Sequence, residues 1–296
     1  MNSPGFKDFE GKVAIITGAG SGFGREFARI GARLGMKLVL ADIQADALDP
    51  VMVEVRLAGA EAIGLLCDVS RPHDVETLAG AALQRFGKIH LAFNNAGVAG
   101  VGGYIWENTE KDWQWVLGVN LWGVIHGIRS FVPVMLRQNE PCHIVNTASV
   151  AGLLTPQLLG VYNVSKHGVV AASETLFHDL RTAGAQIGVS VLCPAFVPTG
   201  IFQSHRNRPL DLAEDRELTA SQIAAQQAGE KAVGAGKLSA AQVAELTFEA
   251  IRENRFYVLP HPRILPAVEL RMQDILAQRN PSDPFSFKPE VVQRPT

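Results

Sequence analysis

Tyr162 and Lys166 lie four residues apart in a stretch, residues 161–183, whose apolar spacing predicts a helix. Residues at this spacing share one face of a helix. A cation within about 4–6 Å lowers the pKa of a tyrosine, ordinarily about 10, by roughly one to three units. We therefore expect Tyr162 and Lys166 to form an acid/base pair that exchanges a proton near neutral pH.

Ser149 adds a third polar group to this pair. It follows a predicted strand at residues 144–147, and the end of that strand and the start of the next helix face the same crevice. No Gly-x-Ser-x-Gly nucleophile elbow surrounds Ser149, which disfavours a hydrolase. The serine is therefore expected to assist the acid/base pair.

A glycine-rich turn, Thr-Gly-Ala-Gly-Ser-Gly-Phe-Gly, occupies residues 17–24 between a predicted strand and a predicted helix. Backbone N–H groups and the positive helix end favour a pyrophosphate there, and side chains at the glycine positions would obstruct it. Phe23 stands where Gly-x-Gly-x-x-Gly has its third glycine, and no P-loop lysine follows. An ordinary turn is the alternative. We expect a dinucleotide cradle that includes Gly18, Ser21, Gly22, Phe23 and Gly24.

Asp42 ends the second predicted strand, where a carboxylate can accept hydrogen bonds from both ribose hydroxyls of adenosine. A 2′-phosphate there would meet a like charge, and neither position 21 nor position 43 is basic. This favours NAD over NADP, with Ile43 at the same edge of the cofactor site. Asp68 and Val69 follow the third strand and are expected to frame the adenine, although Asp68 could instead cap the helix that starts near residue 72.

The elements that must position these residues alternate along the chain, as parallel strands joined by crossover helices do. Strands are predicted at residues 13–17, 38–42, 62–67, 91–94, 144–147, 189–193 and 256–259. Helices are predicted at residues 22–34, 45–58, 72–86, 110–136, 161–183 and 240–253. The expected fold class is α/β, a Rossmann-like, doubly wound, parallel seven-stranded sheet in one domain, residues 1–296, with ligand-binding loops at the carboxyl ends of the strands.

Two segments depart from this alternation. Residues from about 195 to 238 contain no clear strand and are expected to form a lid over the substrate. His205, Arg206 and Arg208 in this segment could receive a substrate carboxylate or lie on a solvated face. Residues 281–296 carry four prolines and predict an extended tail, either frayed or docked on a neighbouring subunit.

Composition excludes several classes of protein. With 27 basic and 29 acidic residues, a net charge of −2 and no basic run, a nucleic-acid partner is not expected. No export signal or membrane span is indicated. Cys67, Cys142 and Cys193 form no Cys-x-x-Cys pair and no cluster with histidines. We expect reduced thiols, a cytoplasmic protein and no metal site.

Taken together, these motifs resemble the short-chain dehydrogenase/reductase family (SDR) in order and spacing. The resemblance spans residues 9 to about 200 and, more loosely, to 260. Ala195 departs from the family pattern, which has glycine after the proline. The matching positions are residues 17–24, Asn94 to Gly97, Asn120, Ser149, Tyr162 with Lys166, and Pro194, Val197 and Thr199.

The resemblance implies an oxidoreductase that uses NAD. Tyr162 would be the general acid/base, Lys166 would lower its pKa and hold the nicotinamide ribose, and Ser149 would bind the reacting oxygen. Asn120 would bend its helix and hold a water that links Lys166 to solvent. The remaining implied cofactor contacts are Asn95, Ala96, Gly97, Pro194, Val197 and Thr199, with Thr199 holding the carboxamide.

The loops near these groups, residues 98–106, residues 150–159 and the lid, are mostly apolar. This favours a small hydrophobic secondary alcohol or ketone, aryl or polycyclic, as substrate, although the side chains could instead pack the loops themselves. A homo-oligomer, a dimer or tetramer, is predicted from apolar residues on the two long helices, namely Trp113, Val116, Phe131, Val169, Leu176 and Phe177. The alternatives are a catalytically idle dinucleotide-binding sensor or scaffold, which the presence of Tyr162 and Lys166 disfavours, and a methyltransferase, which would not require Ser149, Tyr162 and Lys166 in phase.

Overall fold

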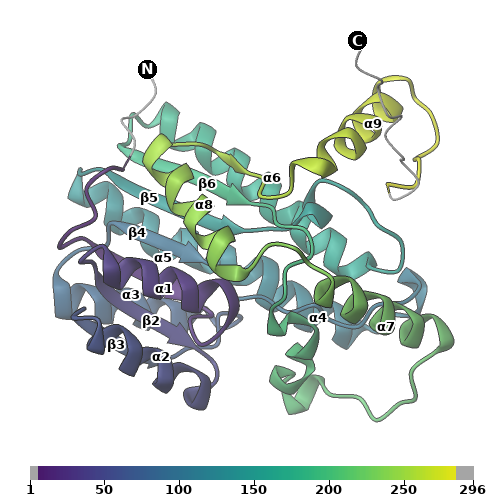
Figure 1. Cartoon of the computed structure of the whole chain (residues 1–296), viewed down its shortest axis with the longest axis horizontal. Helices are drawn as coiled ribbons and strands as arrows, with labels where there is room; N and C mark the ends of the chain where they lie inside the picture. The colour runs from purple at the N-terminus through teal and green to yellow at the C-terminus, as the bar shows by residue number, and fades with distance from the viewer. Residues whose placement is uncertain (1–5, 285–296) are drawn as a thin grey trace.

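Seven parallel strands form one sheet at the centre of the computed structural model, which describes residues 6–284 (Figure 1). The strand order is β3-β2-β1-β4-β5-β6-β7, which confirms the predicted doubly wound, single-domain α/β fold. Strands that are covered on both faces need continuous apolar runs, and every residue of β1 is buried. The strands are β1 (Val13–Thr17), β2 (Lys37–Asp42), β3 (Ala62–Leu66), β4 (Leu91–Asn94), β5 (Cys142–Thr147), β6 (Ile187–Leu192) and β7 (Tyr257–Val258).

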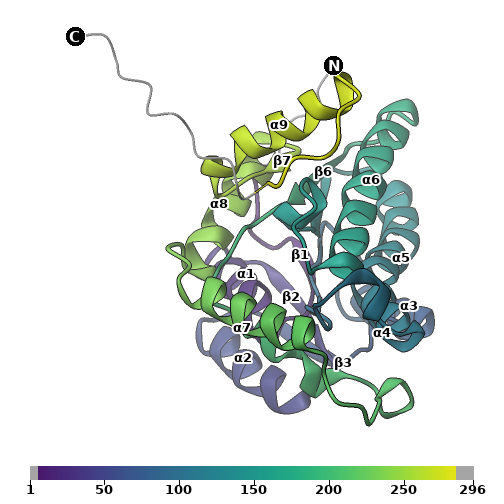
Figure 2. The same ribbon diagram turned by 90° about the vertical axis from the view of Figure 1, so that its right-hand side faces the viewer.

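Helices cover both faces of this sheet, as the end-on view in Figure 2 shows. On one face lie α1 (Gly22–Arg33), α2 (Ala45–Leu57) and α8 (Ala240–Glu253). On the other face lie α3 (Pro72–Phe86), α4 (Glu110–Leu117), α5 (Gly123–Gln138) and α6 (Gly160–Thr182). Each face buries its own apolar cluster against the sheet.

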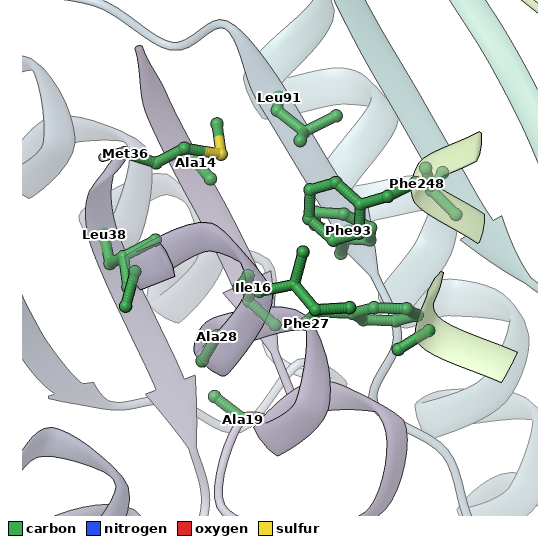
Figure 3. Close-up of a cluster of buried hydrophobic side chains, with 14 of the residues drawn as sticks. Ala14, Ile16, Ala19, Phe27, Ala28, Met36, Leu38, Leu91, Phe93 and Phe248 are labelled. Carbon is green, nitrogen blue, oxygen red and sulfur yellow. The ribbon is translucent and has the colours of Figure 1, made fainter. Parts of the chain in front are cut away.

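Three phenylalanines join the sheet to the helices on the first face (Figure 3). Phe27 of α1 stacks on Phe93 of β4 with ring centroids 4.4 Å apart, and Phe248 of α8 lies 5.6 Å from Phe93. All three side chains are fully buried. Such aromatic pairs add to the free energy gained by burying their area. They fix α1, and with it the glycine-rich turn, against the sheet.

The long helix predicted at residues 110–136 is interrupted in the structure. A π-helical segment, η2 (Gly118–Trp122), separates α4 from α5. The continuous run Glu110–Gln138 is long and apolar enough to cross a membrane, yet half of its most apolar window is buried in the protein. Phe131 and Met135 on α5 pack in the core. The apolar character of this run therefore matches that of a core helix.

Two helices were not predicted from the sequence. The first is α7 (Ala220–Gly234), inside the proposed lid, and the second is α9 (Leu265–Leu276), which follows β7. Thr219 and Gln222 form a capping box at the start of α7, and this pattern was readable in the sequence. Most of the predicted tail, residues 285–296, lies outside the described residues.

The six side chains from which the oligomer was predicted are covered within a single chain. Val116, Phe131 and Val169 are fully buried and Leu176 is nearly so, all within a single chain. Trp113 and Phe177 also pack against buried clusters. These side chains fill the layer between helices and sheet, so they leave no uncovered surface that calls for a partner. An interface between copies of the chain would therefore have to form through other residues.

Candidate active site

A cavity of about 230 Å³ opens at the carboxyl ends of the strands. Its walls are the loops that follow six consecutive strands of the sheet, β1 to β6, where doubly wound folds bind their ligands. The predicted site residues that line it are Gly18, Ser21, Gly22, Phe23, Asp42, Ile43, Asp68, Val69, Asn95, Ala96, Gly97, Ser149, Tyr162, Lys166, Pro194, Val197 and Thr199. Gly24 and Asn120 do not line it.

The glycine turn is packed too closely for side chains. Gly18 has a positive φ of 64°, and a Cβ there would lie 2.8 Å from the Cα of Ala96. Gly24 faces the carbonyl oxygen of Gly18, so a Cβ at position 24 would overlap that atom. Gly24 therefore shapes the turn from behind, which explains why it is absent from the cavity wall.

Ser21 begins α1 as its N-cap residue, and its side chain makes no capping hydrogen bond. The free N–H groups of the first turn of a helix and its positive dipole end favour an anion. Because this turn lacks Cβ atoms at positions 18, 20 and 22, an anion can approach the backbone closely. The cradle fits the pyrophosphate of a dinucleotide.

Asp42 is held by the backbone of the same region. Its Oδ2 accepts a hydrogen bond from the N–H of Gly20 (2.8 Å), and its Oδ1 accepts one from the N–H of Gln44 (3.0 Å). These bonds keep the carboxylate at the end of β2, beside the glycine turn. Ile43 is 43% exposed at the rim next to it. The geometry places a carboxylate and an apolar side chain together on the cavity wall at the end of β2.

Asp68 does not cap the following helix, which was the alternative role considered for it. The N-cap of α3 is Arg71, while the Asp68 carboxylate accepts hydrogen bonds from the N–H (3.0 Å) and hydroxyl (2.7 Å) of Ser70. The carbonyl oxygen of Val69 lies 3.0 Å from Nδ1 of His126. Asp68 and Val69 thus form a braced turn on the cavity wall.

Asn95 ties three strands together beneath the glycine turn. Its Nδ2 donates to the carbonyl oxygen of Thr17 (3.0 Å), and its Oδ1 accepts from the hydroxyl of Thr147 (3.3 Å). The Thr17 hydroxyl in turn accepts the N–H groups of Asn95 (2.9 Å) and Ala96 (3.2 Å). Asn95 lines the cavity, but its side chain serves to brace the loops after β1, β4 and β5.

Ser149, Tyr162 and Lys166 meet at the centre of the cavity. Ser149 follows β5, where its Oγ accepts the N–H of Ala151 (3.2 Å) and donates to the carbonyl oxygen of Pro194 (3.4 Å). It also hydrogen-bonds the hydroxyl of Tyr162. Lys166 Nζ lies 5.6 Å from the Tyr162 ring centroid and donates to the carbonyl oxygen of Thr147 (3.0 Å).

The pKa of Tyr162 is raised, not lowered by Lys166 as the sequence had suggested. Burial raises the pKa of Tyr162 to about 12, and the hydrogen bond with Ser149 opposes this rise only in part. Burial also lowers the pKa of Lys166 to about 8, since its side chain is only 2% exposed. Removal of both groups from water outweighs their mutual influence. At neutral pH Tyr162 therefore carries a protonated phenol.

Asn120 was expected to bend its helix. In the structure it lies in the π-helical segment η2, where the regular helix is interrupted. Its Oδ1 accepts the N–H of Val98 (2.8 Å), and its Nδ2 donates to the carbonyl oxygen of Val98 (2.9 Å) and to Ser165 Oγ (3.1 Å). A Cβ at Gly97 would lie 3.3 Å from Asn120 Oδ1 and 3.6 Å from Lys166 Nζ. Asn120 thus anchors the loop after β4 close to Lys166.

The loop after β6 closes the cavity above the glycine turn. Pro194 accepts the N–H of Val150 (2.9 Å), and the side chain of Val197 is buried in the core. A Cβ at Gly22 would lie 3.5 Å from the side chain of Thr199. Ala195, which departs from the family pattern, donates its N–H to Nδ1 of His261 (3.1 Å). Sequence reasoning missed His261, because no motif marks it.

The other end of the cavity is mostly apolar. All three predicted loops contribute, but Trp106 is 77% exposed and stacks on Tyr104 outside the cavity. Sequence reasoning missed Trp115, Val119, Ser204, Asn207 and Val233. The expected apolar residues that line this end are Val98, Ala99, Val150, Ala151, Pro156, Leu159, Phe196, Ile201 and Phe202.

The lid is fastened to α4 by ion pairs that were not foreseen. Asp112, only 1% exposed, accepts hydrogen bonds from Arg208 Nη1 (2.6 Å) and Arg216 Nη2 (3.0 Å). The Arg208 guanidinium lies 5.3 Å from the centroid of the Trp115 ring. Arg208 is therefore committed to the protein and is not available to a substrate carboxylate.

Residues 6–284 contain no group of three or more His, Cys, Asp or Glu side chains that could hold a metal ion. The three cysteines are buried free thiols, and burial raises the pKa of each to about 12. Such thiols are poor nucleophiles at neutral pH. The chemistry of the site thus falls to Ser149, Tyr162 and Lys166.

Comparisons with known proteins agree with this geometry. The family model described as short chain dehydrogenase matches residues 12–209. A short chain dehydrogenase/reductase from Burkholderia phymatum, solved with NAD, is 59% identical, with 95% of this chain and 100% of that chain covered and a TM-score of 0.93. Solved structures of more distant relatives hold NADP or NADPH.

Two curated relatives carry names of dehydrogenases. A CLA biosynthesis dehydrogenase/reductase of Lactiplantibacillus plantarum is 34% identical over 93% of this chain and 96% of its own. A 1-deoxy-11-beta-hydroxypentalenate dehydrogenase of Streptomyces exfoliatus is 35% identical over 83% of this chain and 82% of its own. On the family model, these similarities and the site geometry, the chain belongs to the short-chain dehydrogenase/reductase family and is an oxidoreductase.

Proposed function

We propose that this protein transfers a hydride between the nicotinamide of NAD and a hydrophobic secondary alcohol or ketone, with Tyr162 as acid/base. The observation that carries the proposal is that one cavity is lined both by the glycine cradle with Asp42 and by Ser149, Tyr162 and Lys166. A sensor or scaffold has no need of the second group. No feature of the cavity favours such an idle protein.

NAD is the proposed cofactor. The turn at Gly18, Ser21, Gly22 and Phe23 would hold the pyrophosphate, and Asp42 would accept hydrogen bonds from the ribose hydroxyls. The carboxylate would repel a 2′-phosphate at the same place. The NAD complex of the Burkholderia phymatum relative supports this choice. Because other relatives hold NADP or NADPH, Asp42 is the residue on which the proposal depends.

The other proposed cofactor contacts enclose the two ends of the dinucleotide. Ile43, Asp68 and Val69 would frame the adenine. Lys166 and Thr199 would hold the nicotinamide ribose and the carboxamide. The loops that complete this enclosure carry Asn95, Ala96, Gly97, Pro194 and Val197.

The nicotinamide, when bound, supplies the hydride to a carbonyl carbon or accepts it from a carbinol carbon. The residues of this chain manage the proton. Tyr162, protonated at neutral pH, donates its hydroxyl proton to the carbonyl oxygen in the reduction direction, and the deprotonated oxygen accepts it in oxidation. Ser149 hydrogen-bonds the reacting oxygen as charge develops. Lys166 places a positive charge beside the resulting phenolate.

The substrate end supports an apolar molecule with one reactive oxygen. Phe196, Ile201 and Phe202 from the lid line the cavity together with Pro156 and Leu159. A Cβ at Gly229 of α7 would overlap the Phe202 ring, so α7 packs directly on that ring. The printed name of the Streptomyces exfoliatus relative indicates a hydroxyl-bearing substrate. We therefore propose a bulky secondary alcohol, with the cytoplasm and its reduced thiols as the setting.

The proposal is tested by incubating the protein with NAD or NADP and a panel of aryl, alicyclic and polyol alcohols while reduced-cofactor absorbance is followed. Turnover of bulky apolar alcohols with NAD is expected, and polyols should react poorly. Replacement Phe202→Ala should raise KM for bulky alcohols with little effect on the affinity for NAD. Cofactor binding without turnover of any alcohol or ketone would identify a sensor instead.

A further inference from the structure

We propose that Arg206, carried by the lid, is a cofactor-binding residue that contacts the pyrophosphate of the dinucleotide and so couples lid closure to the adenosine half of the cofactor. This inference rests on the proposed function, since it needs a dinucleotide in the cavity. Arg206 belongs to the 3₁₀ helix η4 (Gly200–Asn207), which begins directly after Thr199. It lines the same cavity as the glycine turn.

The position of the guanidinium follows from its contacts. Nε donates to Oε1 of Gln44 (3.1 Å), and the N–H of Gln44 is bound to Asp42. Nη1 donates to the carbonyl oxygens of Gln203 (2.7 Å) and Gly200 (3.4 Å). One edge of the guanidinium is therefore fastened beside the ribose end, and another is fastened to the lid.

Nη2 is the group that remains for a ligand, because it has no hydrogen-bond partner among residues 6–284. The place of a Cβ on Gly200 is 3.8 Å from Nη2 and 3.9 Å from Nη1. The neighbouring Thr199 lies over Gly22, at 3.5 Å from the place of its Cβ. The guanidinium therefore lies against the segment that covers the glycine turn, and Nη2 is its donor without a protein partner in the described chain.

The charges around the cavity point to the same assignment. Among the described residues, Lys166 and Arg206 are the two basic side chains on its wall, and Asp42 and Asp68 are the two acidic ones. Lys166 is buried beside Tyr162 and bound to Thr147. A pyrophosphate adds about two negative charges at the other end, and Arg206 is the cation placed to meet them.

A 2′-phosphate is the competing ligand for this arginine. Nε is the donor nearest to the ribose end, and Gln44 already occupies it. The Asp42 carboxylate next to Gln44 also disfavours a second anion at that place. The pyrophosphate is therefore the better match. A purely structural role is the other alternative, since Arg206 also binds the carbonyl oxygens of Gly200 and Gln203 within its own short helix.

Binding of NADH, NADPH, ADP and adenosine to the wild type, Arg206→Gln and Arg206→Lys should be measured by calorimetry at low salt. The charge control is Arg263→Gln, an exposed arginine outside the cavity. We expect Arg206→Gln to weaken the binding of NADH, NADPH and ADP by a similar factor, about tenfold. The affinity for adenosine should stay unchanged. Arg206→Lys should retain part of the affinity that Arg206→Gln loses. Arg263→Gln should bind all four ligands with the affinities of the wild type.

Lid closure is measured separately, by limited digestion with chymotrypsin. ADP should protect residues 200–237 from cleavage in the wild type but not in Arg206→Gln. Adenosine should give no protection in either protein. Equal ADP affinity in the wild type and Arg206→Gln would overturn the inference and leave the proposed function standing. A loss confined to NADPH would overturn it in favour of the 2′-phosphate. A wild type that binds neither NADH nor NADPH would overturn the proposed function itself.

Discussion

Nδ1 of His261 accepts a hydrogen bond from the backbone N–H of Ala195 across 3.1 Å. Ala195 lies on the cavity wall next to Pro194, so a side chain that follows β7 fixes the loop proposed to hold the nicotinamide. Burial lowers the pKa of His261 below its usual value of 6.5, and the imidazole is neutral at pH 7. Only this neutral form has a lone pair on Nδ1 for Ala195.

We expect His261→Ala to lower kcat about tenfold, because a buried N–H left without a partner costs roughly 1–3 kcal/mol. His261→Asn should keep most of the activity, since its Oδ1 can accept the same bond. Because the pKa of His261 lies below 6.5, protonation removes the acceptor only in the acid range beneath that value. In that range the activity of the wild type should decline more steeply than the activity of His261→Asn. Coincident pH profiles of the wild type and His261→Asn would contradict this.

Tyr162→Phe removes only the oxygen that carries the proton. We expect kcat to fall by about 10²–10⁴-fold while the affinity for NADH changes little. Lys166→Ala should damage both quantities, because Lys166 is proposed to bind the nicotinamide ribose as well. Stopped-flow turnover and NADH titration separate the two effects. Near-normal turnover by Tyr162→Phe would exclude Tyr162 as the acid/base.

The ionisation of Tyr162 can be followed without any ligand. With its pKa raised to about 12 by burial, Tyr162 should stay protonated up to about pH 11. The measurement is the near-ultraviolet tyrosinate signal of the wild type minus that of Tyr162→Phe during a pH titration. A tyrosinate that appears in this difference between about pH 7 and 9 would show that Lys166 dominates over burial, as the sequence alone had suggested.

Much of the site could be predicted because its residues stand at strand ends. Parallel strands bring their carboxyl ends to one edge, so Asp42, Asn95, Ser149 and Pro194 had to converge once the strands were placed. The pKa of Tyr162 could not be predicted in this way, because it depends on burial and not on spacing. Position in the strand pattern therefore predicts proximity, while the environment of each group needs the packed structure.

The lid shows the second limit of sequence reasoning. Asp112 pairs with Arg208 and Arg216, which are 96 and 104 residues away in the chain. No local pattern links residues at such separations. Asn95 illustrates a related limit, because its position was expected but its bracing of Thr17 and Thr147 was not. Contacts between distant segments decide what a correctly placed residue does.

Asp42 should control the choice of cofactor. We expect the wild type to show a higher kcat/KM with NAD than with NADP. Asp42→Asn should lower the ratio of these two kcat/KM values by about tenfold, because the repulsion between the carboxylate and the 2′-phosphate is lost. Asp42→Asn keeps an oxygen for the N–H of Gly20 or Gln44, so it disturbs the turn less than alanine would. A higher kcat/KM with NADP for the wild type would refute the assignment of NAD.

Asp112→Asn should loosen the lid without touching the cofactor site. Two arginines then lose a buried counter-charge, which costs roughly 3 kcal/mol in comparable pairs. Because Arg208 packs over Trp115 on the cavity wall, KM for a bulky alcohol should rise several-fold while that for NAD stays near the wild-type value. Glu110→Gln, an exposed change on the same helix, is the matched control. Equal chymotrypsin sensitivity of residues 200–237 in the wild type and Asp112→Asn would speak against this anchoring role.

The protein is expected to form a homo-oligomer through α9, which projects from the body of the domain (Figure 1). Leu265, Met272, Ile275 and Leu276 on this helix are 42–83% exposed. Residues 265, 272 and 276 share one helical face, and such a face is stable in water when a second surface covers it. Covering it with another copy of the chain satisfies both copies at once.

Sedimentation velocity at micromolar concentration should therefore give a mass well above the 31.9 kDa of one chain. Met272→Glu with Leu276→Glu should shift the protein toward the monomer, because both residues lie on this face and each glutamate would have to be buried in the interface. Leu57→Glu on α2, where the leucine is 84% exposed, is the control for an added surface charge and should leave the mass unchanged. A wild type that sediments as a single chain would rule out the oligomer. An oligomer that survives the double substitution would place its interface away from α9, with α5 and its exposed Leu136 as the next surface to test.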